Sequence, residues 1–267
     1  MDTSQRYDAL LTRISELGSV LVAYSGGVDS TLLAVAAHAV LGDDCAAALA
    51  TSDISPASEV EGARMLARHL GLRLIEVETN ELVDPAFREN SPDRCYHCKY
   101  ELFGLLGNVA DAHGLTTVAD GSNADDLTDY RPGRRAAAEF GVVSPLADTG
   151  FTKSDIREVA HLLDLPNWDK PSMACLASRF PYGEPITEER LAMVASAEDK
   201  LRELGLRQFR VRAHSDVARL EVDAPEMEHA WEMRHSVARA IRAAGFAYVA
   251  QDLEGYRTGR LNETLDA

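Results

Sequence analysis

Lysine is scarce in this 267-residue chain, and acidic residues outnumber basic ones. There are 43 aspartates and glutamates against 27 lysines and arginines, so the formal charge is −16. The only lysines are Lys99, Lys153, Lys170 and Lys200, and arginine supplies the remaining basic side chains. Because a field this negative repels a polyphosphate backbone, we expect no nucleic-acid partner.

Long apolar runs are lacking, and there are only four cysteines. No stretch reaches the roughly 18 consecutive apolar residues of a membrane-spanning helix. The first residues do not combine a basic start with an apolar run, as a secretory signal does. We therefore expect a soluble, cytoplasmic protein with no membrane association. Four cysteines in a chain of this length do not form a disulfide scaffold, so any that cluster indicate thiol or metal chemistry.

Short apolar runs alternate with longer amphipathic stretches over the first part of the chain. This alternation is typical of an α/β fold with a parallel sheet that helices cover on both faces. The predicted strands are 20–24, 46–50, 74–77 and 117–119, and the predicted helices lie near 30–40, 58–70, 97–112 and 154–163.

A proline-rich stretch follows, in which Pro166, Pro171, Pro181 and Pro185 interrupt regular structure. Such a stretch is a linker or an active-site loop. Beyond it the pattern predicts a small α+β unit. Its predicted elements are a helix over 187–204, strands in QFRVRAHSDVARLEV, a helix through MEHAWEMRHSVARAIRAAG and a strand over 248–252. We expect two domains, with boundaries 1–170 and 171–267.

The segment SGGVDS directly follows the first predicted strand and opens the first predicted helix. Gly26 and Gly27 let backbone amides approach an anion, and the hydroxyls of Ser25 and Ser30 can donate to phosphate oxygens. Asp29 would repel phosphate unless it binds a cation, which indicates Mg²⁺ bridging pyrophosphate oxygens. The segment lacks the ending of a Walker loop and the spacing of a dinucleotide-binding loop. The alternative interpretation is a glycine turn with an aspartate cap.

In this context SGGVDS resembles the PP-loop of the N-type ATP pyrophosphatases. The resemblance implies that the loop grips the pyrophosphate of ATP while a substrate oxygen attacks the α-phosphorus, which yields an adenylated substrate and pyrophosphate. It also implies that the adenine lies across the strand ends, near residues 50–51 and the GSNADD segment. Thr51, Gly121 and Asp125 are therefore further candidates for ATP binding.

Three of the four cysteines lie in segments that favour metal binding or a reactive thiol. Cys95 and Cys98 form a CxxC in RCYHCK, a spacing that lets two thiolates face one metal or each other. Cys175 lies in the loop PSMACLASR near Arg179, and a neighbouring cation favours the thiolate. Cys45 falls in a predicted strand and is expected to be a core residue.

Three exposed thiols without a fourth favour an iron–sulfur cluster with one open iron over a closed zinc site. Two alternatives remain open. One is a zinc site formed by the three cysteines and His97. The other is a persulfide relay, in which Cys175 carries the sulfur and the CxxC resolves it.

Taken together, SGGVDS, TSDISP, RCYHCK, GSNADD, PSMACLASRFPYG and AYVAQDLEGYRTGRLNE resemble the LarE family of ATP-dependent sulfur transferases, over almost the whole chain. The resemblance implies a small-molecule substrate, pyridinium-3,5-biscarboxylic acid mononucleotide. One of its carboxylates is adenylated and converted to a thiocarboxylate on the way to the nickel-pincer nucleotide cofactor.

The resemblance also bears on the source of the sulfur. Some members of the family sacrifice the thiol of the ACLASR cysteine, and others carry further cysteines that hold a cluster. Because Cys95 and Cys98 accompany Cys175, the chain resembles the second kind. We therefore expect a 4Fe-4S cluster held by these three residues, with Cys175 as the catalytic residue.

A substrate with a phosphate and carboxylates needs cations around it. Arg210 and Arg212 alternate on the FRVR strand and so share one face. With Arg179 they are candidate ligands of the substrate phosphate, although a solvated strand face is the alternative for the pair on the strand. Lys99, directly after the CxxC, is a further candidate, with a solvent-facing helix lysine as its alternative.

Glu198 and Glu221 could bind a metal or act as a base in the same region. Two other functions compete with sulfur transfer to a small molecule. A PP-loop enzyme that thiolates tRNA would be expected to carry a basic face or an RNA-binding module, and the sequence indicates neither. A non-catalytic nucleotide sensor would bind ATP without cleaving it. We also expect a homo-oligomer.

Overall fold

The computed structural model describes residues 3–127, 132–171, 174–257 and 260–264. The chain forms two compact units, which we call unit 1 (Met1–Glu81 and Cys95–Met173) and unit 2 (Leu82–Arg94 and Ala174–Ala267). That Leu82–Arg94 belongs to unit 2 was not anticipated from the sequence. A functional domain boundary between residues 170 and 171 stays a prediction. Ser172 and Met173 of the predicted cysteine loop, and Thr258 and Gly259 of the C-terminal motif, lie outside the described residues.

Unit 1 is built on a parallel sheet with the strand order β3-β2-β1-β4. Side chains of the central strand alternate between two cores, with Val22 and Tyr24 on one face and Leu21 on the other. Both faces are therefore buried, as the apolar strand pattern predicted. The strands are β1 (Val20–Tyr24), β2 (Cys45–Thr51), β3 (Leu74–Glu78) and β4 (Thr117–Ala119).

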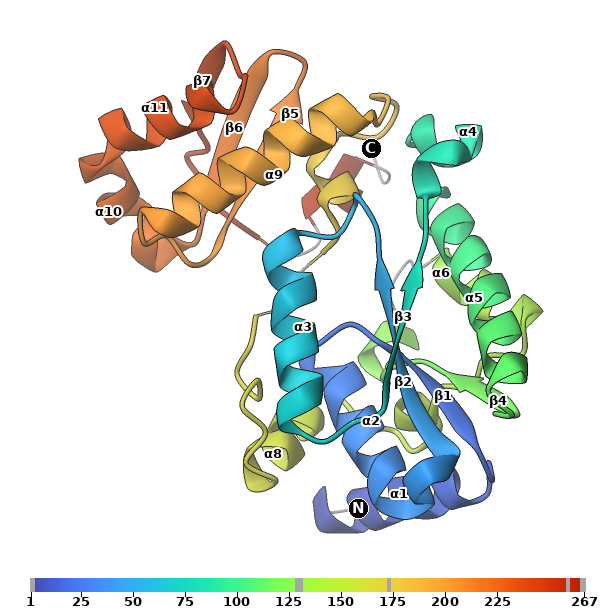
Figure 1. Ribbon diagram of the computed structural model, residues 1–267. Coiled ribbons are helices and arrows are strands. Elements are labelled where there is room, and N and C mark those ends of the chain that lie inside the picture. The colour runs from blue at the N-terminus through green and yellow to red at the C-terminus, as the bar shows by residue number, and fades with distance from the viewer. Residues whose placement is uncertain (1–2, 128–131, 172–173, 258–259, 265–267) are drawn as a thin grey trace. The chain divides into compact units, whose positions relative to one another are not determined.

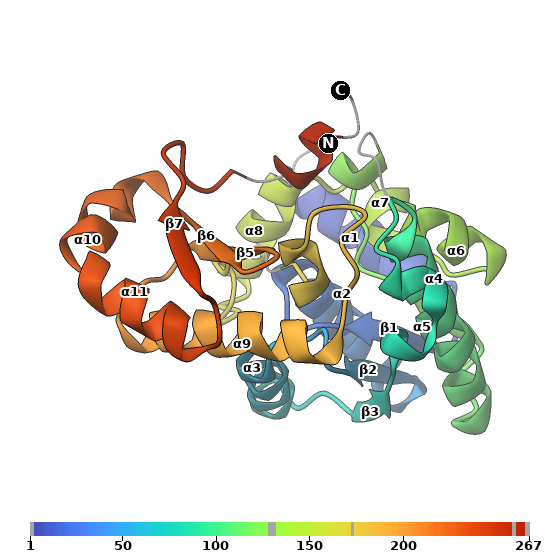
Figure 2. The ribbon, with the colours of Figure 1, turned by 90° about the horizontal axis from the view of Figure 1, so that it is seen from above.

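Helices cover both faces of this sheet, and the predicted α/β class is confirmed (Figures 1 and 2). One face carries α1 (Thr3–Ser15), α2 (Val28–Leu41), α3 (Ala57–His69), α7 (Pro145–Asp148) and α8 (Lys153–Leu162). The opposite face carries α5 (Arg94–Ala112) and α6 (Gly133–Glu139). Short 3-10 turns occupy Gly42–Asp44, Glu81–Val83 and Asp125–Leu127. None of the helices in the described ranges is long and apolar enough to cross a membrane.

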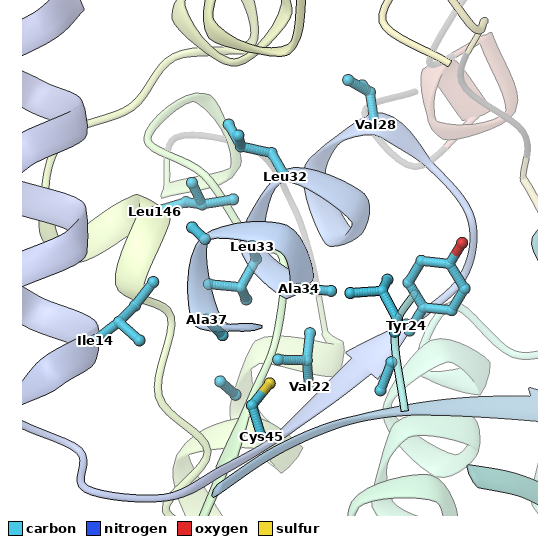
Figure 3. Close-up of a cluster of buried hydrophobic side chains, with 14 of the residues drawn as sticks. Ile14, Val22, Tyr24, Val28, Leu32, Leu33, Ala34, Ala37, Cys45 and Leu146 are labelled. Atoms are coloured by element: carbon cyan, nitrogen blue, oxygen red, sulfur yellow. The ribbon is translucent and has the colours of Figure 1, made fainter. Parts of the chain in front are cut away.

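The core under α2 is drawn in Figure 3. Val22 of β1 faces Leu33 and Ala37 of α2, and Cys45 points its sulfur into the same cluster. Burial raises the pKa of the Cys45 thiol to about 11, although the charge of Arg73 opposes the shift. The prediction that Cys45 is a core residue is confirmed, and its thiol stays protonated and inert.

Unit 2 contains a mixed sheet with the strand order β5-β6-β7. β5 (Phe209–His214) and β6 (Val217–Val222) form an antiparallel hairpin, and β7 (Tyr248–Gln251) pairs with β6 in parallel. The helices of this unit are α4 (Pro85–Arg88), α9 (Glu188–Glu203), α10 (Met227–Glu232) and α11 (Arg234–Ala243). Its 3-10 turns are η4 (Leu176–Arg179), η5 (Ala224–Glu226) and η6 (Arg260–Thr264).

Two features of unit 2 differ from the sequence expectation. The single helix predicted through MEHAWEMRHSVARAIRAAG is two helices, because Met233 adopts φ −86° and ψ 9°, in the bridge region that ends α10. The segment Leu82–Arg94 is joined to the rest of unit 2 by hydrogen bonds from Asn90, whose side chain is fully buried. Its Nδ2 donates to the carbonyl oxygens of Pro181 at 2.6 Å and Glu184 at 2.9 Å.

Candidate active site

The SGGVDS segment forms the turn from β1 into α2, as predicted. Gly26 has φ +69°, in the left-handed region that favours glycine, and a Cβ there would lie 2.7 Å from the Cβ of Ala63. Gly27 precedes the helix in an extended conformation and provides no side-chain cap. The first amides of α2 can therefore donate to an anion, and the helix dipole favours its negative charge.

The two serines of the segment hold the turn together. The Ser30 hydroxyl donates to the Gly27 carbonyl oxygen at 3.1 Å and accepts from the Ser25 amide at 3.2 Å. The two hydroxyl oxygens lie 3.2 Å apart. Gly121 backs the start of α2, since a Cβ there would approach the Ser30 amide nitrogen at 3.0 Å. The predicted roles of these residues in ATP binding stay predictions, but the structure brings them together.

Asp29 and Asp125 both contact Lys153, the first residue of α8. The Lys153 ammonium lies 2.5 Å from Asp29 Oδ2, and its backbone amide donates to Asp125 Oδ2 at 2.8 Å. Carboxylate oxygens are the ligands that Mg²⁺ prefers, so Asp29 and Asp125 have the chemistry that the ion requires, with Asp29 paired to Lys153 in this structure. Sequence reasoning did not select Lys153, although the scarcity of lysine was a usable signal.

Thr51 ends β2, next to the turn that follows β1. Its hydroxyl donates to the Val77 carbonyl oxygen at 3.4 Å. Because the strands are parallel, Ser25, Thr51 and Gly121 lie at or just beyond the carboxyl ends of β1, β2 and β4, at one edge of the sheet. This is the edge at which open α/β sheets bind ligands.

Cys95 and Cys98 lie at the start of α5, within its first five residues, as the sequence predicted. Their three-residue spacing puts both on one side of the helix. Cys95 is exposed, and Cys98 is partly exposed, with its Sγ 3.8 Å from Oε1 of the buried Glu81. The Lys99 ammonium lies 5.4 Å from the ring centre of Phe103.

Cys175 belongs to unit 2, whereas the CxxC belongs to unit 1. Among the described residues, no group of three or more His, Cys, Asp or Glu side chains could hold a metal ion. The donor set of three thiols still suits a cluster with one open iron. That Cys95, Cys98 and Cys175 converge stays a prediction.

The Cys175 loop is held by a buried arginine. Arg179 Nη1 donates to the carbonyl oxygens of Ala174 at 2.8 Å and Cys175 at 3.0 Å. The Ser178 hydroxyl also donates to the Cys175 carbonyl oxygen, at 2.8 Å. Arg179 is 0% exposed, so this residue orders the backbone that presents the partly exposed thiol.

Arg179 is neutralised by Glu198 of α9. Two parallel hydrogen bonds of 2.8 and 2.9 Å join the side chains, which are 0% and 1% exposed. Burial opposes ionisation of Glu198, but the guanidinium outweighs it and keeps the pKa of Glu198 below its ordinary value. Both groups are therefore charged in the folded protein.

Replacing Glu198 with alanine should lower the free energy of unfolding by about 3–5 kcal/mol, because Arg179 would be left as a buried charge without its counter-ion. Urea unfolding measures the loss. Glu254→Ala is the matched control: this carboxylate pairs with Arg257 and Arg260 but is 65% exposed, and its loss should cost less than about 1 kcal/mol. Equal losses in the two variants would contradict a structural role for the buried pair.

Arg210 and Arg212 share one face of β5, as predicted, but that face is buried. The two side chains are 3% and 7% exposed, so the alternative of a solvated strand face is wrong. Arg212 pairs with Glu221 at 2.7 Å and donates to the Ser178 carbonyl oxygen at 2.8 Å. Arg179 and Arg212 thus both bind the backbone of the Cys175 loop.

Arg210 lies close to the same group of charges. Its guanidinium carbon lies 4.8 Å from the ring centre of Tyr256, and Nη1 donates to the Phe209 carbonyl oxygen at 2.7 Å. Burial, with the positive charge of Arg179, lowers the pKa of Arg210. The predicted contacts of the three arginines with a substrate phosphate stay predictions, as do the roles suggested for Glu198 and Glu221.

The carboxylate of Asp252, directly after β7, accepts several hydrogen bonds. It accepts from Arg219 at 2.5 Å, Arg260 at 2.8 Å and the Glu254 amide at 2.9 Å. Burial opposes its ionisation, but these donors outweigh burial and lower the pKa of Asp252 to about 2.

This carboxylate should stabilise the folded state above the unfolded pKa of about 3.9, by about 2 kcal/mol, and the contribution should be lost as the pH falls toward about 2. The check is urea unfolding of the wild type and Asp252→Asn at several pH values. The wild type should lose stability more steeply than the variant between about pH 4 and 2. Parallel profiles would contradict the expected linkage.

Comparison with known proteins identifies the family. The sequence profile of the NAD synthase family matches residues 5–99. Over 257 residues the chain is 38% identical to the pyridinium-3,5-bisthiocarboxylic acid mononucleotide synthase of Lactiplantibacillus plantarum. The match covers 96% of this chain and 93% of that protein. The chain belongs to the LarE family.

Two other relatives are similar to the chain at different levels of identity. An uncharacterized protein of Synechocystis is 46% identical over 253 residues, or 94% of each chain. One subunit of the glutamine-hydrolyzing GMP synthase of Archaeoglobus fulgidus is 24% identical over 200 residues, which cover 67% of this chain and 63% of that protein. The LarE-family chain is an ATP-dependent sulfurtransferase with the PP-loop ATP pyrophosphatase fold, as its motifs predicted.

Proposed function

We propose that this LarE-family chain adenylates a carboxylate of pyridinium-3,5-biscarboxylic acid mononucleotide and converts it to a thiocarboxylate, in the synthesis of the nickel-pincer nucleotide cofactor. The observation that carries the proposal is the 38% identity, over 96% of this chain, with a protein named for the bisthiocarboxylic product. The arrangement of the PP-loop and of the Cys175 loop supports it. That the enzyme acts as a homo-oligomer stays a prediction.

Unit 1 would perform the adenylation. A carboxylate is a poor electrophile because its leaving group would be oxide, and adenylation replaces that group with AMP. The amides of the SGGVDS turn and of the first turn of α2 bind the departing pyrophosphate and stabilise its charge. Asp29, with Asp125 nearby, would hold Mg²⁺, which when bound neutralises pyrophosphate charge.

Cys175 would take part in the transfer of sulfur. In one version its thiolate attacks the acyl adenylate and expels AMP to form a thioester. A base then removes the α-proton of Cys175, and its carbon–sulfur bond breaks to leave the thiocarboxylate and dehydroalanine. In the other version Cys175 joins Cys95 and Cys98 as a thiolate ligand of a 4Fe-4S cluster, which when bound would supply the transferred sulfur.

The arginines near Cys175 would bind the negative groups of the substrate. Arg179, Arg210 and Arg212 place three guanidinium groups in one region of unit 2. Guanidinium groups bind phosphates and carboxylates strongly, which supports this role close to the Cys175 loop. Lys99, directly after the CxxC, would be a further cation that binds the substrate phosphate.

The test is an assay of purified protein with MgATP and the pyridinium substrate. We expect pyrophosphate release that depends on the substrate, and a product in which one carboxylate oxygen is replaced by sulfur, read by mass spectrometry. ATP that binds but is not cleaved would overturn the proposal in favour of a nucleotide sensor. Pyrophosphate release that requires tRNA would redirect it to tRNA thiolation.

A second measurement separates the two versions of sulfur transfer. Iron and acid-labile sulfide are measured on protein purified without oxygen, together with Cys95→Ala and Cys175→Ala. About four irons per chain, lost in both variants, would support the cluster. Absence of iron, with Cys175 losing the mass of hydrogen sulfide after one turnover, would support the sacrificial version.

A further inference from the structure

A turn at the end of unit 1 holds the carbonyl group of the PP-loop glycine. Asn167 Nδ2 donates to the Gly26 carbonyl oxygen at 3.1 Å and to Thr31 Oγ1 at 3.0 Å. The Lys170 ammonium lies 3.4 Å from the same carbonyl oxygen and forms an ion pair with Glu59 at 2.7 Å. Two side chains of one turn therefore converge on a single backbone oxygen of the loop.

The orientation of this carbonyl decides where the next amide points. The carbonyl of Gly26 and the N–H of Gly27 belong to one trans peptide plane, so they point in opposite directions. Gly26 has φ +69° and no side chain to restrict rotation of the plane. When Asn167 holds the carbonyl, the Gly27 amide is directed away from Asn167, to the side of the Ser25 hydroxyl, to which it donates a long hydrogen bond of 3.4 Å. This is the start of α2, where an anion would bind.

The hydrogen bonds of Asn167 indicate that its side-chain nitrogen, not its side-chain oxygen, is the group that acts on the loop. The residue is 7% exposed, and within the described part of the chain its Oδ1 is buried without a hydrogen-bond partner. An unpaired buried acceptor costs free energy, and an apolar residue at this position would avoid that cost. The two hydrogen bonds that the side-chain nitrogen donates explain why a polar residue occupies this position despite that cost.

The turn does not depend on the Asn167 side chain for its shape. Backbone bonds close it, from Trp168 to Leu165 and from Lys170 to Asn167, both of 3.1 Å. The Trp168 ring also packs edge-on against His161 of α8, with 4.6 Å between ring centres. The turn is thus a preformed support, and the side chain at 167 can act on the loop.

We propose that Asn167 is a positioning residue for pyrophosphate binding: it fixes the Gly26–Gly27 peptide so that the Gly27 amide faces the pyrophosphate of ATP. Lys170 assists at the same carbonyl. The inference rests on the PP-loop binding ATP, the first half of the proposed function.

The experiment measures the affinities of MgATP, inorganic pyrophosphate and adenosine by calorimetry for the wild type and for Asn167→Ala and Asn167→Asp. Asn167→Asp keeps the size of the side chain but removes its donor. We expect both variants to bind MgATP and pyrophosphate about 10-fold or more weakly, since a hydrogen bond to a charged group is misdirected. Adenosine affinity should stay within about twofold, because adenosine does not reach the loop with a phosphate.

Two control variants separate positioning from stability. Thr31→Val removes the other partner of Asn167 but leaves the bond to Gly26, so the pyrophosphate affinity should stay close to that of the wild type. Asn90→Ala removes a similarly buried amide in unit 2 and should lower the melting temperature without changing the ratio of ATP to adenosine affinity.

Unchanged pyrophosphate affinity in both Asn167 variants would overturn the inference, and so would an equal loss of adenosine affinity. Those outcomes leave the proposed function standing, because the wild type would still bind and cleave ATP. If the wild type itself bound no MgATP, the adenylation half of the proposed function would fall together with the inference.

Discussion

Replacing Cys175 with alanine is expected to abolish sulfur transfer while the release of pyrophosphate continues. Both versions of the proposed chemistry need this thiol, as the sulfur donor in one and as a cluster ligand in the other. The PP-loop belongs to unit 1 and Cys175 to unit 2, so adenylation should not require the thiol. Product thiocarboxylate, measured by mass spectrometry, should fall at least about 1000-fold, as when a nucleophile is removed.

Cys45→Ala is the control for this variant. Cys45 is 4% exposed in the core of unit 1, and burial raises its pKa to about 11. The control should lose some stability but keep sulfur transfer, since a protonated core thiol does no chemistry. Sulfur transfer that survives in Cys175→Ala would remove Cys175 from the reaction.

Replacing Gly26 with alanine is expected to eliminate tight ATP binding and to destabilise unit 1. A methyl group there would lie 2.7 Å from the Cβ and 2.9 Å from the Cα of Ala63 in α3, so the loop or the helix must move. The left-handed conformation adds about 1–2 kcal/mol. A displaced loop misdirects several amides together, so MgATP affinity should fall about 100-fold or more, measured by calorimetry.

Gly18→Ala isolates the steric part of this effect. Gly18 has φ +73°, close to that of Gly26, but a Cβ there meets no atom within 4 Å. The control should therefore show only the conformational cost, about 1–2 kcal/mol, with MgATP affinity unchanged. Equal effects of the two substitutions on stability and on affinity would show that contact with α3 does not shape the loop.

Local patterns predicted the elements of the fold well. β1 and β4 have the predicted bounds, and the predicted strands over 46–50 and 74–77 are each present with small extensions. The PP-loop lies between a strand and a helix, and the CxxC lies at a helix start, as predicted. These features depend on apolar periodicity and on glycine, which act over a few residues.

The exposure of the FRVR arginines was not predictable in the same way. Alternation on β5 correctly placed Arg210 and Arg212 on one face, but periodicity does not tell which face other elements will cover. The structure covers this face with carboxylates and the Cys175 loop, so Arg212 meets Glu221 and Ser178. Those partners come from β6 and η4, and no local signal connects them.

The sequence by itself determined the family, the alternating α/β pattern, and where the PP-loop and the CxxC lie, because each motif is a short run of residues close together in the chain. Only the tertiary structure decided which side chains support the loop. Lys153 meets Asp29, and Asn167 meets the Gly26 carbonyl, across more than a hundred residues of chain. Contacts at such separations follow from how helices and turns pack on the sheet, and a single sequence carries no periodic signal for that packing.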